Sequence, residues 1–312
     1  VEGLFDGSVR AFVSLGGNLV RAVPDQARME QAWAAQDLTV MVSTKLNRSH
    51  LFPAKQAFIL PCLGRFETDE QATGAQTITT EDSFSMISGS IGYRPPVSDA
   101  VKSELAIVTG IAKAAVPAMP GLKWDEWTAD YGLVRDLIEH TYPDDFRDFN
   151  GRMYEAGGFY RGNGAHERIW KTPEGKAVFT TPGQLNSLGF QDAPGRFRLI
   201  TMRSNDQFNT TIYGYSDRLR GLEGSRDIVL MCPEDIAEAG LSDGQTIALI
   251  TDVADGHDRR LSGLKLTAYQ LPRGTIAGYY PECNVLVPMQ HHDALSGTPA
   301  SKSVPVRVEA ER

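Results

Sequence analysis

Cysteine and long apolar runs are both scarce in this sequence. Its 312 residues include 3 cysteines, Cys62, Cys232 and Cys283. Cysteines this few, odd in number and far apart fit reduced thiols in a cytoplasmic protein better than a disulfide framework. No apolar run reaches the roughly eighteen residues that a membrane span needs. The sequence does not begin with a basic segment followed by an apolar segment, so we expect no secretory signal.

Positive charge is also in the minority. The chain has 31 lysine and arginine residues against 39 aspartate and glutamate residues, a net charge of -8. Proteins that bind nucleic acids or membrane surfaces in general carry an excess of basic residues, so this balance argues against both partners. The 41% of hydrophobic residues is typical of a soluble globular protein, and the length allows two domains.

The first residues, "VEGLFDGSVRAFVSLGGN", contain no methionine and pass from a helix end directly into a strand. This pattern is typical of the interior of a domain. We therefore expect this sequence to be part of a longer polypeptide. The N-terminal remainder of that polypeptide would be a partner of these residues.

Strands and helices alternate over residues 10–110. Apolar runs predict parallel strands, the first of them buried, and helical spacing predicts a helix over residues 24–36 and another over 98–116, with Ser98 as its N-cap. The predicted strands cover residues 10–17, 37–44 and 57–62. Such alternation implies a parallel sheet with right-handed crossovers, so the fold class is α/β, with a parallel α/β unit over residues 1–115.

The pattern changes twice further along the chain. Residues 116–194 contain one predicted helix, near 127–140, among loops rich in glycine and aromatic residues. We interpret them as a linking region that covers the cleft between domains. Short β-rich runs with one embedded helix then fill residues 195–312, and they predict a small closed barrel.

The stretch "CNVLVPMQHHDALSG" brings Cys283, His291, His292 and Asp293 close together in sequence. Adjacent histidines point to different sides of a strand or a helix, and no second cysteine is near, so a zinc site is not favoured. A cysteine nucleophile with a histidine base finds no support in the flanking residues. The favoured interpretation is a polar loop between barrel strands.

Three polar clusters each follow a predicted strand. "SLGGN" offers backbone N–H groups to an anion, although such turns are often purely structural. "STKLNRSH" lies where open α/β sheets bind ligands, at the carboxyl end of a strand. "TMRSNDQFNT" combines amides, hydroxyls and an arginine, which suits a ligand bearing phosphates, the alternative being a solvated loop. The candidate residues are Gly16, Gly17, Asn18, Ser43, Thr44, Asn47, Arg48, Thr201, Arg203, Ser204, Asn205, Gln207, Asn209 and Thr210.

These clusters, followed by "PEDIAEAGLSDGQTIAL", "ECNVLVP" and "TPASKSVPVRV", stand in a characteristic order. The chain thereby resembles the C-terminal half of the molybdopterin oxidoreductases of the dimethyl-sulfoxide-reductase and formate-dehydrogenase superfamily. Within it, the resemblance is to formate-dehydrogenase-like alpha subunits of the FdhF/YdeP type. It extends from about residue 10 to the end of the sequence.

The resemblance implies a molybdenum or tungsten bis-molybdopterin guanine dinucleotide cofactor, bound between a Rossmann-like unit and a six-stranded double-psi barrel. It places the glycine turn and the "STKLNR" segment on one dinucleotide tail and the "TMRSNDQFNT" loop on the pterins and phosphates. Asn284 and Lys302 match positions near the cofactor. Many relatives have an aspartate that holds the guanine where this chain has Ser43 and Thr44, so the guanine contact at that site stays open.

In this family the ligand to the metal, the catalytic base and the cysteines of an iron–sulfur cluster lie upstream, so a 4Fe–4S cluster is expected only in the N-terminal remainder. The resemblance assigns no catalytic residue or metal ligand here. His50 and His140 have two interpretations, a place near the active site or a structural role, and the structural role is favoured. The cofactor would carry the chemistry and this part of the protein would bind and orient it.

Three functions remain open from the sequence. One is a formate-dehydrogenase-like oxidoreductase that acts on a small-molecule substrate by two-electron transfer, with an electron-transfer partner. Another is a non-catalytic scaffold subunit of the same fold, which would not need the polar loop. An unrelated hydrolase or nucleotide-binding domain is disfavoured, because the G-x-S-x-G and P-loop motifs are absent.

Overall fold

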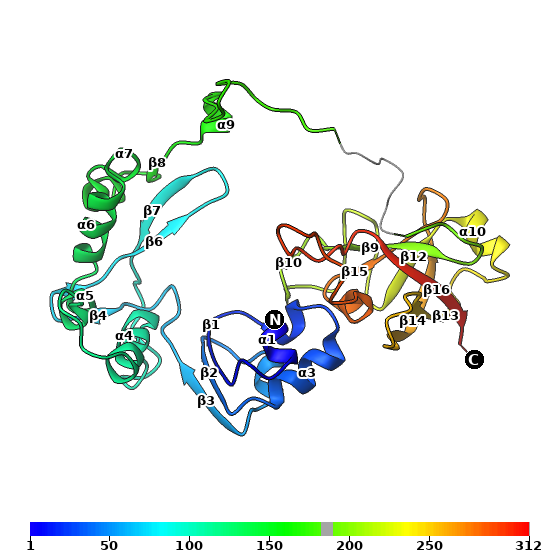
Figure 1. Cartoon of the computed structure of the whole chain (residues 1–312), viewed down its shortest axis with the longest axis horizontal. Helices are drawn as coiled ribbons and strands as arrows, with labels where there is room; N and C mark the ends of the chain where they lie inside the picture. Colours follow the sequence, from blue (N-terminus) through cyan, green and yellow to red (C-terminus); the bar gives the residue numbers. More distant parts are fainter. Residues whose placement is uncertain (182–189, 312) are drawn as a thin grey trace.

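The computed structural model describes residues 1–181 and 190–311. Three parts follow one another along the chain (Figure 1): a parallel α/β unit, a lobe of antiparallel strands and short helices, and a closed β-barrel. This arrangement confirms the predicted fold class. No helix among the described residues combines the length and the apolar character needed to cross a membrane.

The α/β unit, residues 1–62, is a three-stranded parallel sheet with helices packed on one face. Val40 of the central strand lies opposite Val13 and Phe58 of its two neighbours. Met29 and Trp33 of the main helix are fully buried against the sheet. The elements are α1 (Glu2–Phe5), β1 (Ala11–Leu15), α2 (Leu19–Ala22), α3 (Gln26–Ala34), β2 (Leu38–Ser43), the 3-10 helix η1 (Arg48–Leu51) and β3 (Gln56–Pro61).

The opposite face of this sheet is only partly covered. A helix from the next part, α4 (Glu104–Ala115), packs Ile107 against Val42 and Cys62. Val13 on β1 and Phe58 on β3 remain 50% and 54% exposed. The prediction that β1 is buried was therefore wrong, and β3 is exposed as well, because the covering helix reaches only the carboxyl ends of β2 and β3.

The lobe, residues 63–160, combines short antiparallel strands with a run of helices. Ile87, Phe149 and Phe159 form its core with Met153. Its elements are β4 (Glu70–Gln71), β5 (Gly74–Ala75), β6 (Ile78–Glu81), β7 (Met86–Ser90), α4, α5 (Trp124–Ala129), α6 (Gly132–Thr141), α7 (Pro143–Phe146), α8 (Phe149–Arg152) and β8 (Phe159–Tyr160). Because β8 pairs with β7, the segment expected to be a linker contributes a strand to this lobe. The domain boundaries stay predictions.

Two helices of the lobe differ from their predicted bounds. The N-cap of α4 is Ser103 rather than Ser98, since the Ser103 hydroxyl accepts a hydrogen bond from the Ala106 N–H at 3.2 Å. The helix predicted near 127–140 is two helices, α5 and α6. They are separated because Asp130 adopts an extended backbone between them, with φ -146° and ψ 107°.

The barrel closes in the strand order β12-β14-β13-β16-β9-β15. Its interior is lined by fully buried aliphatic side chains such as Leu199, Leu249 and Leu266. The elements are β9 (Phe197–Met202), the hairpin of β10 (Gln207–Phe208) and β11 (Thr211–Ile212), β12 (Ile228–Met231), α10 (Pro233–Glu238), β13 (Thr246–Thr251), β14 (Arg260–Ala268), β15 (Thr275–Tyr279), the 3-10 helix η2 (Glu282–Leu286) and β16 (Val304–Ala310). The closed barrel with one embedded helix confirms the prediction for this region.

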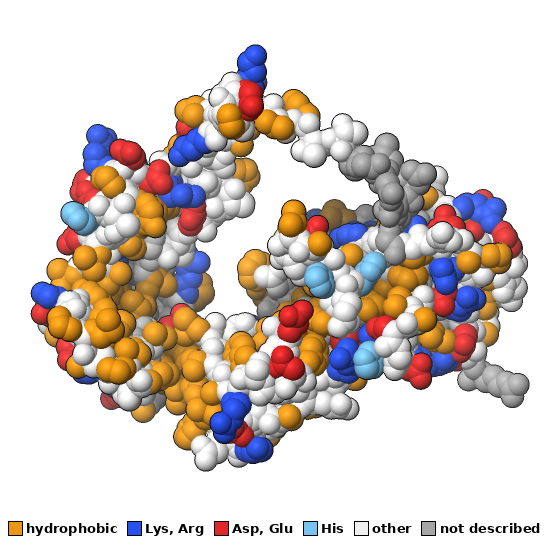
Figure 2. Space-filling model, viewed as in Figure 1, with side chains coloured by type: hydrophobic (Ala, Val, Ile, Leu, Met, Phe, Trp, Pro, Cys, Tyr) orange, Lys and Arg blue, Asp and Glu red, His pale blue; other side chains and the backbone are white. Residues whose placement is uncertain are grey.

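A connection containing α9 (Gly164–Glu167) runs from the lobe toward the barrel (Figure 1). Figure 2 shows a wide opening on this side of the molecule, bordered by the three parts. The predicted role of residues 116–194 as a cleft cover stays a prediction, and residues 182–189 lie outside the described part of the chain.

The α/β unit and the barrel are joined by a buried ion-pair cluster. Asp25, just before α3, has a left-handed backbone with φ 54°. Its carboxylate accepts hydrogen bonds from Arg259 of the barrel and from the Met289 N–H at 3.0 Å. Arg259 also pairs with Asp255 at 2.7 Å. We call these residues, Asp25, Arg259 and Asp255, the junction cluster.

Candidate functional site

The first two predicted clusters meet at the carboxyl edge of the parallel sheet. Gly16 and Gly17 follow β1 with φ 62° and 72°, values that favour glycine. Apart from the chain neighbours, no described atom lies within 4 Å of the place where a Cβ would stand at either residue, so a ligand can approach the turn closely. The Gly16 N–H itself already donates to the Val42 carbonyl at 2.8 Å. The Asn47 side-chain amide donates to the Gly17 carbonyl at 2.7 Å and so ties the second cluster to the first.

Two polar atoms at this edge are buried and lack a partner among the described residues, Asn18 Oδ1 and His50 Nε2. The Asn47 N–H lies 3.0 Å from His50 Nδ1, which leaves Nε2 as the unpartnered ring nitrogen. Two unpaired polar atoms therefore lie at this edge. Because buried polar groups normally find partners, this edge fits a polar ligand. Since α2 has only four residues, its dipole contributes little to that fit.

The other residues of the second cluster differ in the contacts that their side chains make. The Ser43 hydroxyl donates to the Lys45 carbonyl at 2.7 Å, and the Arg48 guanidinium pairs with Glu30 at 2.6 Å. Thr44 is exposed and lines a cavity of about 270 Å³ between the sheet edge and the lobe. Ser43 and Arg48 thus hold the loop in place, while Thr44 is free to contact a ligand.

The barrel loop after β9 has an inner and an outer side. Gln207 fixes the inner side, because its amide donates to the carbonyls of Asn209 at 2.7 Å and Tyr280 at 2.6 Å. Its side-chain oxygen accepts from the Ser204 N–H at 3.1 Å. Arg203 and Asn209 face outward, are exposed, and contact each other at 3.4 Å. Asn205 and Thr210 are half-buried and Thr201 is buried.

Three cations gather at this loop: Arg203, Arg220 and Lys302, which we call the cation cluster. Arg220 donates to the Arg203 carbonyl at 3.1 Å and also pairs with Asp217. The Lys302 ammonium donates to the Thr201 carbonyl. Burial lowers the pKa of Lys302, and the charges of Arg203 and Arg220 lower this pKa further. Lys302 and the arginines are therefore close enough to repel one another.

The cation cluster has an excess of positive charge. Within the described residues, Arg220 is its single member with a carboxylate partner. The alternative that Arg203 pairs with Asp206 is not observed in the described residues, where the Asp206 carboxylate instead accepts from the Asn205 amide at 2.9 Å. Uncompensated neighbouring cations on a polar loop are the donor set that a phosphate or diphosphate group requires.

Asn284 lies elsewhere, at the contact between the barrel and the α/β unit. It is buried, and its amide nitrogen is shared by three carbonyls at the end of α2, those of Arg21 at 3.1 Å, Ala22 at 3.0 Å and Val23 at 2.8 Å. This contact holds the two parts together. The structure therefore groups Lys302 with the barrel loop and separates Asn284 from it.

The stretch around Cys283 contains a buried thiol and a surface loop. Cys283 belongs to the barrel core, and burial raises its pKa to about 12. The ring of His291 contacts the Ser303 carbonyl at 2.6 Å, and that of His292 contacts the Asp293 carbonyl at 2.9 Å. A thiol with so high a pKa is a poor nucleophile, which agrees with the favoured interpretation of a loop.

The sequence did not point to two arginines of this region, Arg220 and Arg226. Arg220 completes the cation cluster, and Arg226 is buried beneath the barrel loop. They follow the predicted loop in the chain but belong to no motif within it. The fold brings them back to it, so a local pattern of residues could not identify them.

A parallel α/β unit joined to a closed barrel, with a polar loop and a cation cluster on the barrel, defines a cofactor-binding class of protein. Residues 197–305 match the family model of the molydopterin dinucleotide binding domain. The match covers the barrel, and the similarities that follow support the dimethyl-sulfoxide-reductase superfamily for the chain.

Similar proteins extend the comparison to nearly the whole chain. Protein YdeP of Escherichia coli is 41% identical over 311 residues, which are 99% of this chain and 41% of that protein. An uncharacterized oxidoreductase of Mycobacterium tuberculosis is 40% identical over 315 residues, covering 99% of this chain and 40% of its own length. The chain thus spans about two fifths of the length of these relatives.

A solved structure supports the fold. Acetylene hydratase from Pelobacter acetylenicus superposes with a TM-score of 0.59 at 15% identity, covering 99% of this chain and 46% of that one. At this identity the likeness concerns the fold, and the similarity covers all three parts of the chain.

Proposed function

We propose that this chain is the cofactor-binding portion of a molybdenum- or tungsten-dependent oxidoreductase that oxidises or reduces a small substrate, such as formate, by two electrons. The observation that carries the proposal is the cation cluster. Its members Arg203 and Lys302 have no carboxylate partner in the described residues, and they lie in a barrel that matches a molybdopterin dinucleotide binding model. A bis-molybdopterin guanine dinucleotide supplies the anionic diphosphates that these cations lack.

The described residues fit such a cofactor at two places. Arg203, Arg220 and Lys302 would hold one diphosphate, and the polar groups of the barrel loop would hold the adjoining pterin. The open turn of Gly16 and Gly17, with the unpaired Asn18 oxygen, would hold the second dinucleotide tail. When bound, the cofactor supplies the two-electron chemistry, and this chain orients it. The N-terminal remainder, a 4Fe–4S cluster within it, an electron-transfer partner and a cytoplasmic location belong to the same proposal.

The test uses the full-length protein from cells supplied with molybdate. We expect about one metal per chain and release of guanine nucleotide on acid hydrolysis. Arg203→Ala is expected to weaken cofactor binding roughly ten- to a hundredfold, because a charged hydrogen bond is worth about 1.5–3 kcal/mol, and thereby to lower the metal content. Arg203→Lys is expected to recover it only in part, since lysine lacks the planar fork.

Arg260→Ala is the matched control. Arg260 is an exposed barrel arginine that pairs with Glu309 and Glu311, so its loss should leave the metal content unchanged. A folded wild-type protein without metal or pterin would contradict the proposal and favour the scaffold function. Full metal content in both Arg203 variants, together with a lower melting temperature, would show that Arg203 has a structural role only.

A further inference from the structure

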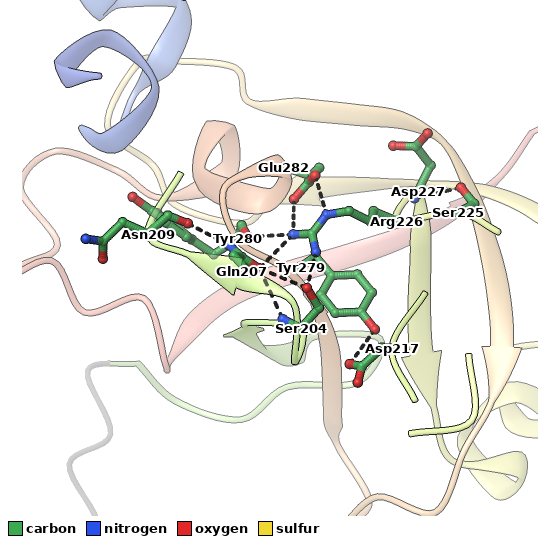
Figure 3. A network of polar contacts seen from close by, with 10 residues as sticks. All are labelled: Ser204, Gln207, Asn209, Asp217, Ser225, Arg226, Asp227, Tyr279, Tyr280 and Glu282. Carbon is green, nitrogen blue, oxygen red and sulfur yellow. Dashed lines mark hydrogen bonds and ion pairs between the residues drawn. The ribbon is translucent and has the colours of Figure 1, made fainter. Parts of the chain in front are cut away.

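Arg226 lies beneath the barrel loop, two residues before the start of β12, and is only 3% exposed. Figure 3 shows its guanidinium at the centre of a polar network. It donates to the Ser204 hydroxyl at 2.8 Å and to the Gln207 side-chain oxygen at 3.1 Å, both on the loop. It also donates to the Tyr280 carbonyl at 2.8 Å. One buried side chain therefore fixes the inner side of the loop.

Glu282 is the carboxylate partner of this guanidinium. Its two carboxylate oxygens accept from Arg226 at 2.8 and 2.9 Å. The guanidinium also lies 4.5 Å from the centre of the Tyr279 ring, and the Tyr279 hydroxyl donates to Asp217 at 2.8 Å. A planar group with five donors can meet all of these partners at once, whereas the ammonium of a lysine cannot.

The network reaches the cation cluster on one side. Asp217, which accepts from Tyr279, is also the carboxylate that pairs with Arg220. Arg220 in turn donates to the Arg203 carbonyl at 3.1 Å. The positions of both outward arginines therefore depend on contacts that begin at Arg226.

The network reaches the α/β unit on the other side. Glu282 is the first residue of η2, and Asn284 of the same short helix holds the end of α2 by its three carbonyl contacts. The glycine turn immediately precedes α2. A continuous set of contacts thus joins the two places that would hold the cofactor.

We propose that Arg226 is a positioning residue: it holds the inner side of the barrel loop so that Arg203 and the outer amides face the anionic cofactor. This inference rests on the proposed function of the chain. It assigns Arg226 no contact with the cofactor, because Arg226 is buried and each of its three side-chain nitrogens already donates to a protein acceptor.

The experiment measures metal and guanine nucleotide per folded full-length chain. Arg226→Lys keeps the charge beside Glu282 but loses the bonds to the loop, so we expect the affinity for the cofactor to fall roughly tenfold or more and the occupancy to fall with it. Ser204→Ala removes one loop partner while Arg226 stays, and a smaller fall in the same direction is expected. This second variant decides the matter if Arg226→Lys does not fold. Arg260→Lys is the control and should keep full occupancy.

A double-mutant cycle separates positioning from general destabilisation. If Arg226 acts through Arg203, the double variant Arg203→Ala with Arg226→Lys should lose little more cofactor than Arg203→Ala alone. Losses that multiply would overturn the proposal, as would full occupancy in both Arg226→Lys and Ser204→Ala. A wild-type protein without cofactor overturns the proposed function as well, whereas a loaded wild type beside equally loaded variants overturns the positioning role alone.

Discussion

Lys302 shows how the site is prepared for negative charge at the scale of one residue. Burial, followed by the charges of Arg203 and Arg220, lowers the pKa of its ammonium. A bound anion acts in the opposite direction, because it stabilises the protonated form. The pKa of Lys302 therefore rises when an anion binds.

This linkage predicts a pH dependence of anion binding. Between the pKa of Lys302 in the free protein and its higher pKa in the complex, binding takes up a proton at Lys302, and this uptake by itself lowers the affinity as the pH rises through this range. The range begins below the usual lysine value of about 10.4. Calorimetry of inorganic diphosphate with the cofactor-free full-length protein, in buffers of different ionisation enthalpy, measures the uptake.

Lys302→Met should bind diphosphate more weakly at neutral pH and lose the proton uptake assigned to Lys302. An unchanged uptake in this variant would show that another group titrates.

Gly278 and Cys283 make a second test at this scale. A Cβ at Gly278 on β15 would overlap the Cys283 sulfur inside the barrel core. Gly278→Ala should therefore lower the free energy of unfolding by about 1–3 kcal/mol. Adding Cys283→Ala makes room for the methyl group and should recover part of this loss, as measured by denaturant unfolding. Strictly additive effects would mean that the two positions do not share the space.

At the scale of elements, α4 covers the carboxyl ends of β2 and β3. The N-cap residue of α4 determines where this covering helix begins. Ser103 caps the helix and its hydroxyl also lies 2.8 Å from the Tyr131 hydroxyl. Ser98, the predicted cap, is exposed, and among the described residues its hydroxyl accepts only from the nearby Ala100 N–H at 3.2 Å. The sequence offers two serines before one apolar run, and tertiary contacts decide between them.

We expect Ser103→Ala to lower the free energy of unfolding by about 0.5–2 kcal/mol, the usual cost of losing an N-cap. Ser98→Ala is the control and should change stability by less than about 0.5 kcal/mol. Urea unfolding of both variants measures the difference. Equal effects, or a larger effect at Ser98, would contradict the assignment of the cap.

At the scale of the whole molecule, the junction cluster fixes the α/β unit against the barrel. Burial alone would raise the pKa of Asp25. The hydrogen bonds from Arg259 and the Met289 N–H, together with the charges of Arg259 and Arg28, outweigh it, so the pKa is lowered. A carboxylate with a depressed pKa stabilises the folded state above its unfolded pKa of about 3.9, and this contribution is lost as the pH falls through the folded pKa.

Asp25→Asn removes this charge and keeps a residue type that tolerates the left-handed backbone. We expect a loss of about 3 kcal/mol at neutral pH, because Arg259 loses a buried partner but keeps Asp255. The difference between variant and wild type should shrink below about pH 3.9. Unfolding curves across pH measure it, and a pH-independent difference would show that the charge of Asp25 is not responsible.

The sequence predicted the fold better than it predicted the site. Periodicity identified the strands of both folded units, since each has a consistently apolar core face. The sequence did not predict that β1 and β3 are exposed, because an apolar strand has the same sequence pattern whether or not another element covers it. The barrel loop was recognised as one polar stretch after a strand. Arg220 and Arg226 were not, because their contact with this loop exists only after the chain has turned back.

The strand order of the barrel constrains the order in which it can form during synthesis. β16 (Val304–Ala310) lies between β13 and β9 and pairs with both. Until Ala310 has left the ribosome, the barrel stays an open sheet with two unpaired edges, which are prone to pair with other chains. The pairing of β9 with β16 also spans most of the barrel sequence, and such non-local contacts form slowly. The nascent chain is therefore most exposed to misassembly just before its cofactor-binding barrel is complete.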